Sequence, residues 1–184
     1  SIRWRLCSAN DDHAANIFPT ILSGYCVVMS KFDEVFFSGT FGGEALSLTA
    51  AIQTVKELEE RDALTHVWEV GDLLRDGYNA IAAEIGLSDV TGCIGYGFWP
   101  EFTFSEARGH SPALLQTLLV QEIVRRGVLT RAPMFISYSH DSNDVTATLL
   151  AFREGLQVVS EAIADGDIES WLEGDIIAPV IRAS

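Results

Sequence analysis

The stretch Ser38-Gly39-Thr40-Phe41-Gly42-Gly43-Glu44 decides how this 184-residue chain is organised. It joins an apparent strand end at residues 35–37 to a well-patterned helix that begins near Glu44. A loop of hydroxyl residues and glycines that opens a helix presents free backbone N–H groups at the positive end of the helix dipole, which suits a phosphate. The same residues also fit a simpler role, in which Ser38 or Thr40 only caps the helix.

Apolar residues at helical spacing predict four helices beyond this loop. The first starts at Glu44, and Asp62 and Thr65 offer caps for the second, which stops at Gly86. Arg125 and Arg126, at the end of the third, suit the negative end of its dipole. The predicted helices cover residues 44–61, 64–85, 111–127 and 141–163.

The remaining regular segments read as short strands. β-Branched and aromatic residues predict a strand at 20–28 and another at 134–138. Between 90 and 105, glycines alternate with apolar residues and Pro100 interrupts the run, which predicts two antiparallel strands joined by a turn. Interleaved strands and helices predict a layered α/β or α+β domain. The acidic tail after Asp165 offers Trp171 and Ile176–Ile177 as its anchors.

Charge and cysteine content exclude several classes of protein. The chain has 26 acidic and 12 basic residues and a net charge of −14, which opposes binding to nucleic acid or to an anionic membrane. Three cysteines without a C-x-x-C pair argue against a disulfide framework and a zinc site, and favour the cytoplasm. The apolar run at 17–29 is too short to span a bilayer.

The sequence FFSGTFGGEALSLTAA, residues 36–51, resembles class III pyridoxal-phosphate-dependent aminotransferases, in the branch that is similar to glutamate-1-semialdehyde aminomutase. The likeness covers roughly residues 29–165 and continues in the same order through four further motifs. These are Trp68 to Gly71, Gly92 to Phe98, Arg125 to Leu129, and Ser137-Tyr138-Ser139-His140.

The resemblance implies the C-terminal small domain of the fold-type I pyridoxal-phosphate-dependent transferase fold, preceded by the end of the large domain. Residues 1–43 would be a remnant of the large cofactor domain, 44–61 an interdomain helix, and 62–184 the small α+β domain. The chain begins with Ser instead of Met, which we interpret as processing, cutting or origin from a longer protein.

The resemblance also implies a cofactor contact. Matching loops in the family reach the phosphate of pyridoxal 5′-phosphate in the neighbouring subunit of a dimer, which assigns Thr40 to that phosphate, with Ser38 and Gly39 shaping the approach. Gly42 and Gly43 are interpreted as residues that set the backbone conformation. The intact family acts on small amino and keto compounds, and transfers an amino group between them.

The family's chemistry needs a lysine amine that holds the cofactor as an imine, about thirty residues before the motif threonine. Counting back from Thr40 reaches Asp11, or Asp12 with a one-residue slip, and the chain's two lysines, Lys31 and Lys56, are misplaced. No catalytic residue is therefore assigned, and the chain is expected to be inactive alone.

Other signals are weaker. Ser139-His140-Asp141 contains the residue types of a catalytic triad, but adjacent residues cannot form its side-chain relay. His140 is expected to pack or to form a hydrogen bond at a strand end, with a role beside the substrate as the alternative that the resemblance implies. The four histidines lack metal-ligand spacing, so no metal site is predicted. The glycines at 92–97 do not open a helix as a dinucleotide loop does.

The sequence thus predicts the C-terminal part of a pyridoxal-phosphate-dependent aminotransferase or aminomutase. Its expected partner is a second copy or a complementing large-domain subunit. The alternative is a non-catalytic assembly or interaction module, either a degenerate paralogue or half of a split enzyme. A third possibility is an unrelated α/β binding domain.

Overall fold

The computed structural model describes residues 45–130 and 132–177 of the chain. The chain divides into two compact units, Ser1–Arg61 and Asp62–Ser184. In the first unit the described element is helix α2 (Ala45–Glu60), which confirms the helix predicted from Glu44. The predicted strand at 20–28 lies outside the described residues.

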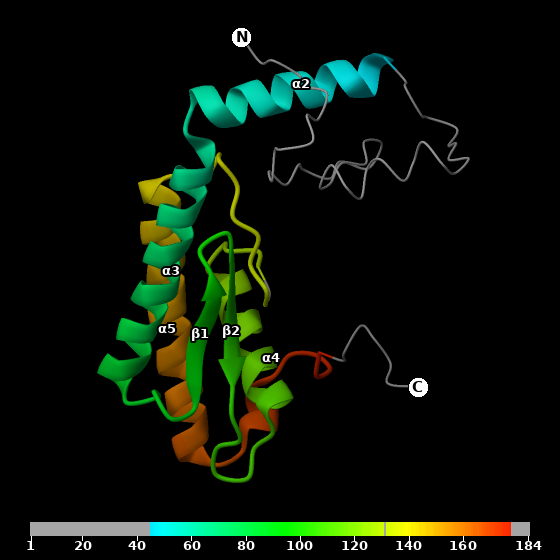
Figure 1. Ribbon diagram of the computed structural model, residues 1–184. Helices are drawn as coiled ribbons and strands as arrows, with labels where there is room; N and C mark the ends of the chain where they lie inside the picture. Colours follow the sequence, from blue (N-terminus) through cyan, green and yellow to red (C-terminus); the bar gives the residue numbers. More distant parts are fainter. Residues whose placement is uncertain (1–44, 131, 178–184) are drawn as a thin grey trace, which may run out of the picture. The chain divides into compact units, whose positions relative to one another are not determined.

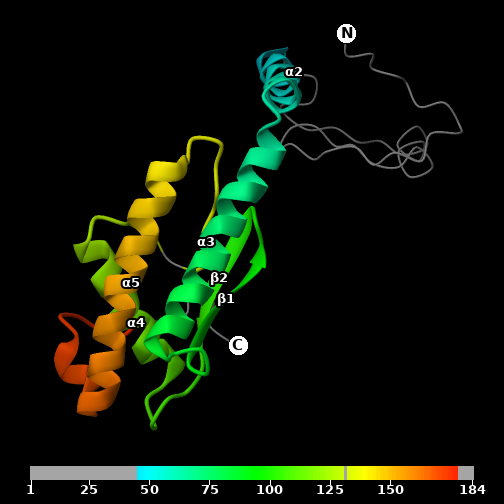
Figure 2. The same ribbon diagram turned by 90° about the vertical axis from the view of Figure 1, so that its left-hand side faces the viewer.

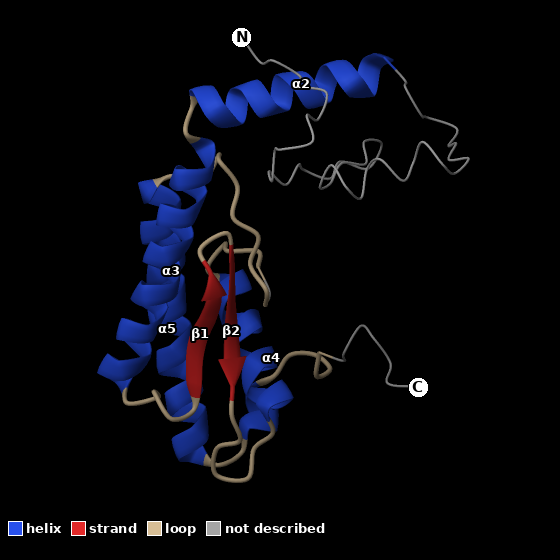
Figure 3. Ribbon diagram, in the orientation of Figure 1, coloured by secondary structure: helices blue, strands red, loops and turns tan. Residues whose placement is uncertain are grey.

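The second unit places helices behind a β-hairpin (Figure 1, Figure 3). Helix α5 packs against both α3 and α4, while the hairpin packs against α3 and α4. Figure 2 shows the hairpin at the edge of this layer, with none of the helices of the second unit on its outer face. The elements are α3 (Ala63–Ile85), β1 (Thr91–Tyr96), β2 (Trp99–Phe104), α4 (Pro112–Arg125), α5 (Ser142–Asp165) and the 3₁₀ turn η2 (Ile168–Trp171).

The predicted antiparallel pair is confirmed, with Cys93 opposite Phe102 and Tyr96 opposite Trp99. Cys93 and Phe102 point toward the helices and are buried, and burial raises the pKa of the Cys93 thiol to about 12. The outer edge of β1 is covered by Asn79 of α3, whose amide accepts from Cys93 N–H at 2.7 Å and donates to Cys93 C=O at 2.9 Å.

The core centres on three aromatic rings from three different elements. Tyr78 of α3, Phe102 of β2 and Phe152 of α5 are buried, with ring centroids 5.0–6.0 Å apart. The Tyr78 hydroxyl lies 2.6 Å from Thr91 Oγ1, so the buried phenol keeps a hydrogen-bond partner, and burial raises its pKa.

Two glycines bring α3 and the hairpin turn into backbone contact. A Cβ on Gly71 would lie 1.5 Å from the carbonyl oxygen of Gly97, and a Cβ on Gly97 would lie 2.5 Å from that of Trp68. The backbones of α3 and the hairpin therefore pack closely at this turn, where a side chain has no room.

The predicted strand at Met134–Tyr138 is wrong, although the chain runs beside β2 there. Met134 N–H donates to Pro100 C=O at 2.8 Å and Ile136 N–H donates to Phe98 C=O at 3.3 Å. Pro100 has no N–H to return to Met134, so the two-way pairing of an antiparallel ladder cannot form at this point.

The predicted helix caps are observed, except at the N-terminus of α3. Gly86 and Gly166 end α3 and α5 with positive φ, and the Asp141 carboxylate accepts from the first backbone N–H groups of α5 in a capping box. Asp62 precedes α3 but has φ 47° and makes no side-chain cap, because its carboxylate accepts from the Thr65 hydroxyl instead.

Helix α4 and the C-terminal segment are joined by a charged network that the sequence analysis missed. The carboxylate of buried Glu122 contacts both Arg125 and Arg126, which also pair with Glu173 and Glu154 respectively. The two arginines therefore do more than complement the helix dipole. The tail itself is anchored by Ile168, which is fully buried, whereas Ile176 and Ile177 are partly exposed.

We expect Gly71→Ala to destabilise the second unit by about 3 kcal/mol or more, because the new methyl group would collide with the Gly97 carbonyl. The matched control is Gly174→Ala, which meets no atom within 4 Å and should change stability by less than about 0.5 kcal/mol. Urea unfolding followed by tryptophan fluorescence measures both. A Gly71→Ala protein as stable as the wild type would contradict the close contact.

Glu122 should make stability depend on pH. Burial opposes its ionisation, but hydrogen bonds from Arg126 and Gln121 and the charges of both arginines prevail, and its pKa lies below the usual 4.5. Its stabilisation is thus complete above about pH 4.5 and disappears as the pH falls through the lowered folded-state pKa.

We therefore expect Glu122→Gln to cost about 1–3 kcal/mol of unfolding free energy near pH 7, and much less near pH 3. Exposed Glu161 provides the control, because Glu161→Gln should show no such pH-dependent difference. Denaturant titrations at both pH values test this. An unchanged Glu122→Gln deficit in acid would argue against a lowered pKa.

Candidate functional site

The residues predicted to contact the cofactor lie outside the described part of the chain. Ser38, Gly39 and Thr40 fall before the first described residue, as do Asp11 and Asp12 at the expected lysine position. The structure does give the element that the loop leads into, since α2 begins at Ala45, directly after Glu44. The phosphate contact of Thr40 therefore stays a prediction.

The described lysine, Lys56, lies in the interior of α2. Its neighbours along the helix include Glu57, Glu59 and Glu60, so it stands in an acidic segment. Four arginines of the second unit, Arg75, Arg125, Arg126 and Arg153, also pair with carboxylates. The described residues thus do not fit the whole cofactor, which needs an imine-forming lysine and unopposed phosphate donors.

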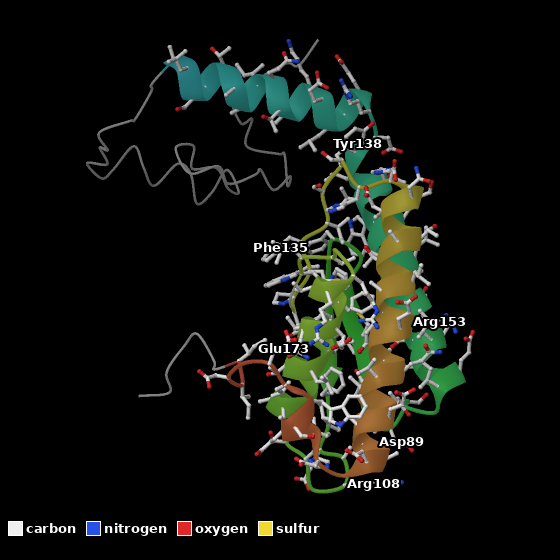
Figure 4. The ribbon with its side chains drawn as sticks, turned by 180° about the vertical axis from the view of Figure 1, so that it is seen from behind. Asp89, Arg108, Phe135, Tyr138, Arg153 and Glu173 are labelled. Atoms are coloured by element: carbon white, nitrogen blue, oxygen red, sulfur yellow. The ribbon has the colours of Figure 1, made fainter. Side chains whose placement is uncertain are left out.

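The second unit has a cleft of about 520 Å³ between α3, the start of α5 and residues 128–130 and 133–136. Val70 and Leu74 form its α3 wall, and Phe135, which is labelled in Figure 4, lies on the opposite segment. Its polar groups are Thr130, His140, Asp144 and Thr148. The cleft is therefore mainly apolar, with its polar side chains concentrated near the beginning of α5.

His140 sits at the rim of this cleft with a defined hydrogen-bond pattern. Ser137 N–H donates to His140 Nδ1 at 3.0 Å, and a ring nitrogen that accepts from an amide carries no proton. The proton of the neutral ring is therefore on Nε2. The backbone carbonyl of His140 accepts a hydrogen bond from His66 Nε2 at 2.8 Å. The neutral His66 ring therefore also carries its proton on Nε2.

These contacts confirm that His140 is hydrogen-bonded, although the segment before it is not a strand. The rejection of a Ser139-His140-Asp141 triad is also consistent with the geometry. The Asp141 carboxylate accepts from Asn143 and Asp144 N–H, and these backbone hydrogen bonds lower its pKa. It serves as a helix cap, while the hydroxyl close to His140 Nδ1, at 3.2 Å, belongs to Ser137.

Within residues 45–130 and 132–177, no group of three or more His, Cys, Asp or Glu side chains is arranged to hold a metal ion. The helices of this same part of the chain are all too short or too polar to cross a membrane.

Two features of the second unit, the cleft and the Glu122 network, were not predicted from the sequence. The cleft is formed by residues from three separate segments, which no local pattern connects. The Glu122 network had a visible signal, because Arg125 and Arg126 follow Glu122 at the spacing of neighbours on a helix face.

No protein-family model matches the chain. It is similar to curated glutamate-1-semialdehyde 2,1-aminomutases of archaea. The Natronomonas pharaonis enzyme is 26% identical over 67% of this chain and 35% of its own length, and the Haloquadratum walsbyi enzyme is 23% identical over the same shares. A shorter match to the Halobacterium salinarum enzyme is 35% identical over 34% of this chain and 15% of that enzyme.

Solved structures share the fold. The pyridoxal phosphate internal aldimine form of FumI from Sphingopyxis sp. MTA144 matches with a TM-score of 0.66 and 23% identity, over 82% of this chain and 36% of that chain. An omega-transaminase from Sphaerobacter thermophilus matches with a TM-score of 0.62 and 20% identity, over 74% of this chain and 34% of that chain.

The expected fold class is confirmed by these structures, and the match to all of them is partial. The chain spans about a third of the length of the curated relatives that it matches. It is therefore similar in sequence to part of the glutamate-1-semialdehyde aminomutases, and it has the fold of part of the fold-type I pyridoxal-phosphate-dependent transaminases.

Proposed function

We propose that the chain is the C-terminal part of a class III pyridoxal-phosphate-dependent aminotransferase or aminomutase. This proposal rests on the sequence similarity to glutamate-1-semialdehyde 2,1-aminomutase, which covers 67% of this chain and 35% of that enzyme. In its complete form such an enzyme would transfer an amino group between a small amino compound and a carbonyl compound, with the cofactor supplying the electron sink.

The chain itself does not attach the cofactor. Covalent attachment requires a lysine amine, and this chain has lysines at positions 31 and 56 only. Lys56 is in the acidic interior of α2, and the positions expected for the lysine hold Asp11 and Asp12, whose charge would repel a phosphate. We therefore assign no catalytic residue to this chain.

The contribution of the chain to a cofactor site is a phosphate contact. Ser38, Gly39 and Thr40 precede α2, and the N-terminus of a helix this long attracts an anion through its free N–H groups and dipole. Thr40 would add a hydroxyl donor, and Ser38 and Gly39 would let the phosphate approach. The phosphate belongs to the site of a partner subunit, in a homodimer or with a complementing large-domain subunit in the cytoplasm.

A specific observation also supports the alternative of a non-catalytic interaction module, either a degenerate paralogue or half of a split enzyme. The outer face of the hairpin carries exposed aromatic side chains, which is typical of a protein–protein contact. In either case the chain acts through a partner.

The isolated chain should not form a specific lysine adduct with pyridoxal phosphate. After incubation with the cofactor and reduction by borohydride, we expect mass spectrometry to find no preferentially modified lysine, and no transaminase turnover before reduction. The complete Natronomonas pharaonis aminomutase serves as the positive control. A single stoichiometric adduct on Lys31 or Lys56 that accompanies turnover would overturn the assignment.

Thr40→Val should weaken phosphate binding by the complex of this chain with its partner subunit by about ten-fold, the value of one hydrogen bond to a charged group. Isothermal titration with pyridoxal phosphate and with inorganic phosphate measures the effect. Thr49→Val is the matched control, because Thr49 is exposed on α2 and its hydroxyl donates to Ala45 C=O. Equal loss in both variants, or in neither, would remove Thr40 from the phosphate site.

A further inference from the structure

A depression of about 390 Å³ lies at the end of the second unit where α3 and α5 terminate. We name it the Arg108 depression. Its volume falls within the range of small-molecule sites, and its floor is apolar because the apolar side chains that line it are buried. The lining includes three buried apolar residues, Leu87, Ala107 and Ile163, and three exposed charged residues, Asp89, Glu106 and Arg108.

The charged residues of the Arg108 depression come from two loops at the same end of the unit. Asp89 follows α3, whereas Glu106 and Arg108 lie between β2 and α4. Figure 4 shows Asp89 and Arg108 together at this end. The fold therefore brings two carboxylates and one guanidinium around a single apolar floor.

These three charges are not used by the second unit itself. Within the residues that the structure describes, Asp89, Glu106 and Arg108 form no ion pair, and their side chains make no hydrogen bond. The other described arginines of this unit all pair with carboxylates. Separate charges of both signs in one depression suit a ligand that carries both signs itself.

Arg108 also occupies a backbone position that rarely accepts arginine. Ala107 and His110 exchange two backbone hydrogen bonds, and the residues between them, Arg108 and Gly109, have φ of 49° and 84°. This is the pattern of a type I′ turn, whose first central position favours asparagine, aspartate or glycine. An arginine there is costly because its Cβ crowds the backbone, and such an outlier points to a role of the side chain outside the turn.

Helix ends strengthen the preference for a positive group on one side of the depression. Gly86 and Ala164, which line it, lie at the C-terminal ends of α3 and α5, where the helix dipoles are negative. With Asp89 and Glu106, these ends attract an ammonium group. The guanidinium of Arg108 instead suits a carboxylate, which it can bind through two parallel hydrogen bonds.

We propose that the Arg108 depression binds a small amino acid with an apolar side chain, in its zwitterionic form. The α-carboxylate pairs with Arg108, the α-ammonium group pairs with Asp89 and Glu106, and the side chain covers the apolar floor. A simple cation would leave Arg108 without a partner, and a simple anion would face two carboxylates. Both charges are therefore needed on one ligand.

Titration of the isotope-labelled full-length chain with L-leucine, followed by NMR, tests this proposal. We expect the amide signals of residues 86–90 and 106–110 to shift with a dissociation constant of about 1 mM or tighter. Isoamylamine lacks the carboxylate of leucine, and isocaproate lacks its ammonium group. Each of these analogues should bind about ten-fold more weakly or worse.

Four results would overturn the proposal. The first is an absence of saturation by about 20 mM L-leucine. The second is a set of shifts confined to other parts of the chain. Isoamylamine that binds as well as L-leucine would make the depression a site for cations, and isocaproate that binds equally well would make it a site for anions.

The variant Arg108→Asn separates a role in binding from a role in folding. Asparagine is preferred at this turn position, so we expect the variant to be at least as stable as the wild type in urea unfolding. It should still bind L-leucine about ten-fold more weakly, because the guanidinium is gone. Arg153→Gln is the control and should leave the affinity unchanged, since Arg153 pairs with Glu84 and does not line the depression.

Unchanged affinity in Arg108→Asn would contradict the proposal, and a loss of stability with unchanged affinity would make Arg108 a partner of the protein's own carboxylates. If stability and affinity both fall, Arg108→Lys and Arg108→Gln decide, because both place a long side chain at the turn and only lysine keeps the charge. The lysine variant should then bind L-leucine about five-fold more tightly than the glutamine variant. Equal affinities of these two variants would overturn the proposal.

Discussion

The backbone contact between Gly71 and Gly97 is the constraint on which the second unit depends. It brings the hairpin turn against α3 more closely than any side chain would permit. From this point β1 and β2 run along the helices so that Cys93 and Phe102 reach the core beside Tyr78. The same placement determines which side chains point away from the core, because successive residues of a strand point to opposite faces of the sheet.

Sequence patterns predicted the helices of the second unit well, because each has one apolar face and recognisable start or stop residues. Gly86 and the Asp141 capping box are local signals, and local signals survive folding. The strand predicted at 134–138 does not form for a non-local reason. Residues 134–136 lie beside Pro100, which has no N–H group and cannot complete a two-way ladder. The cleft was also unpredictable, since α3, α5 and residues 128–130 and 133–136 become neighbours only through tertiary packing.

For the candidate site, the sequence is more informative than the described part of the structure. The Ser38–Glu44 motif and the absent lysine are legible in the sequence, because chemistry restricts residue type more strongly than packing does. The described structure adds the helix that follows the motif, and it shows that Arg75, Arg126 and Arg153 are paired with carboxylates. On the function that we propose, the chain carries one component of a catalytic site and a partner supplies the others.

Asn79 has a consequence for how the exposed hairpin is protected from pairing with other strands. Its amide occupies the outward N–H and C=O of Cys93, while Thr91 N–H donates to Leu87 C=O and Gly95 C=O accepts from Arg75. On the other side, residues 134–136 cover part of the edge of β2. Strand-by-strand growth into fibrils needs free edges, so these contacts reduce the length of hairpin edge that could act as a template for amyloid-like stacking.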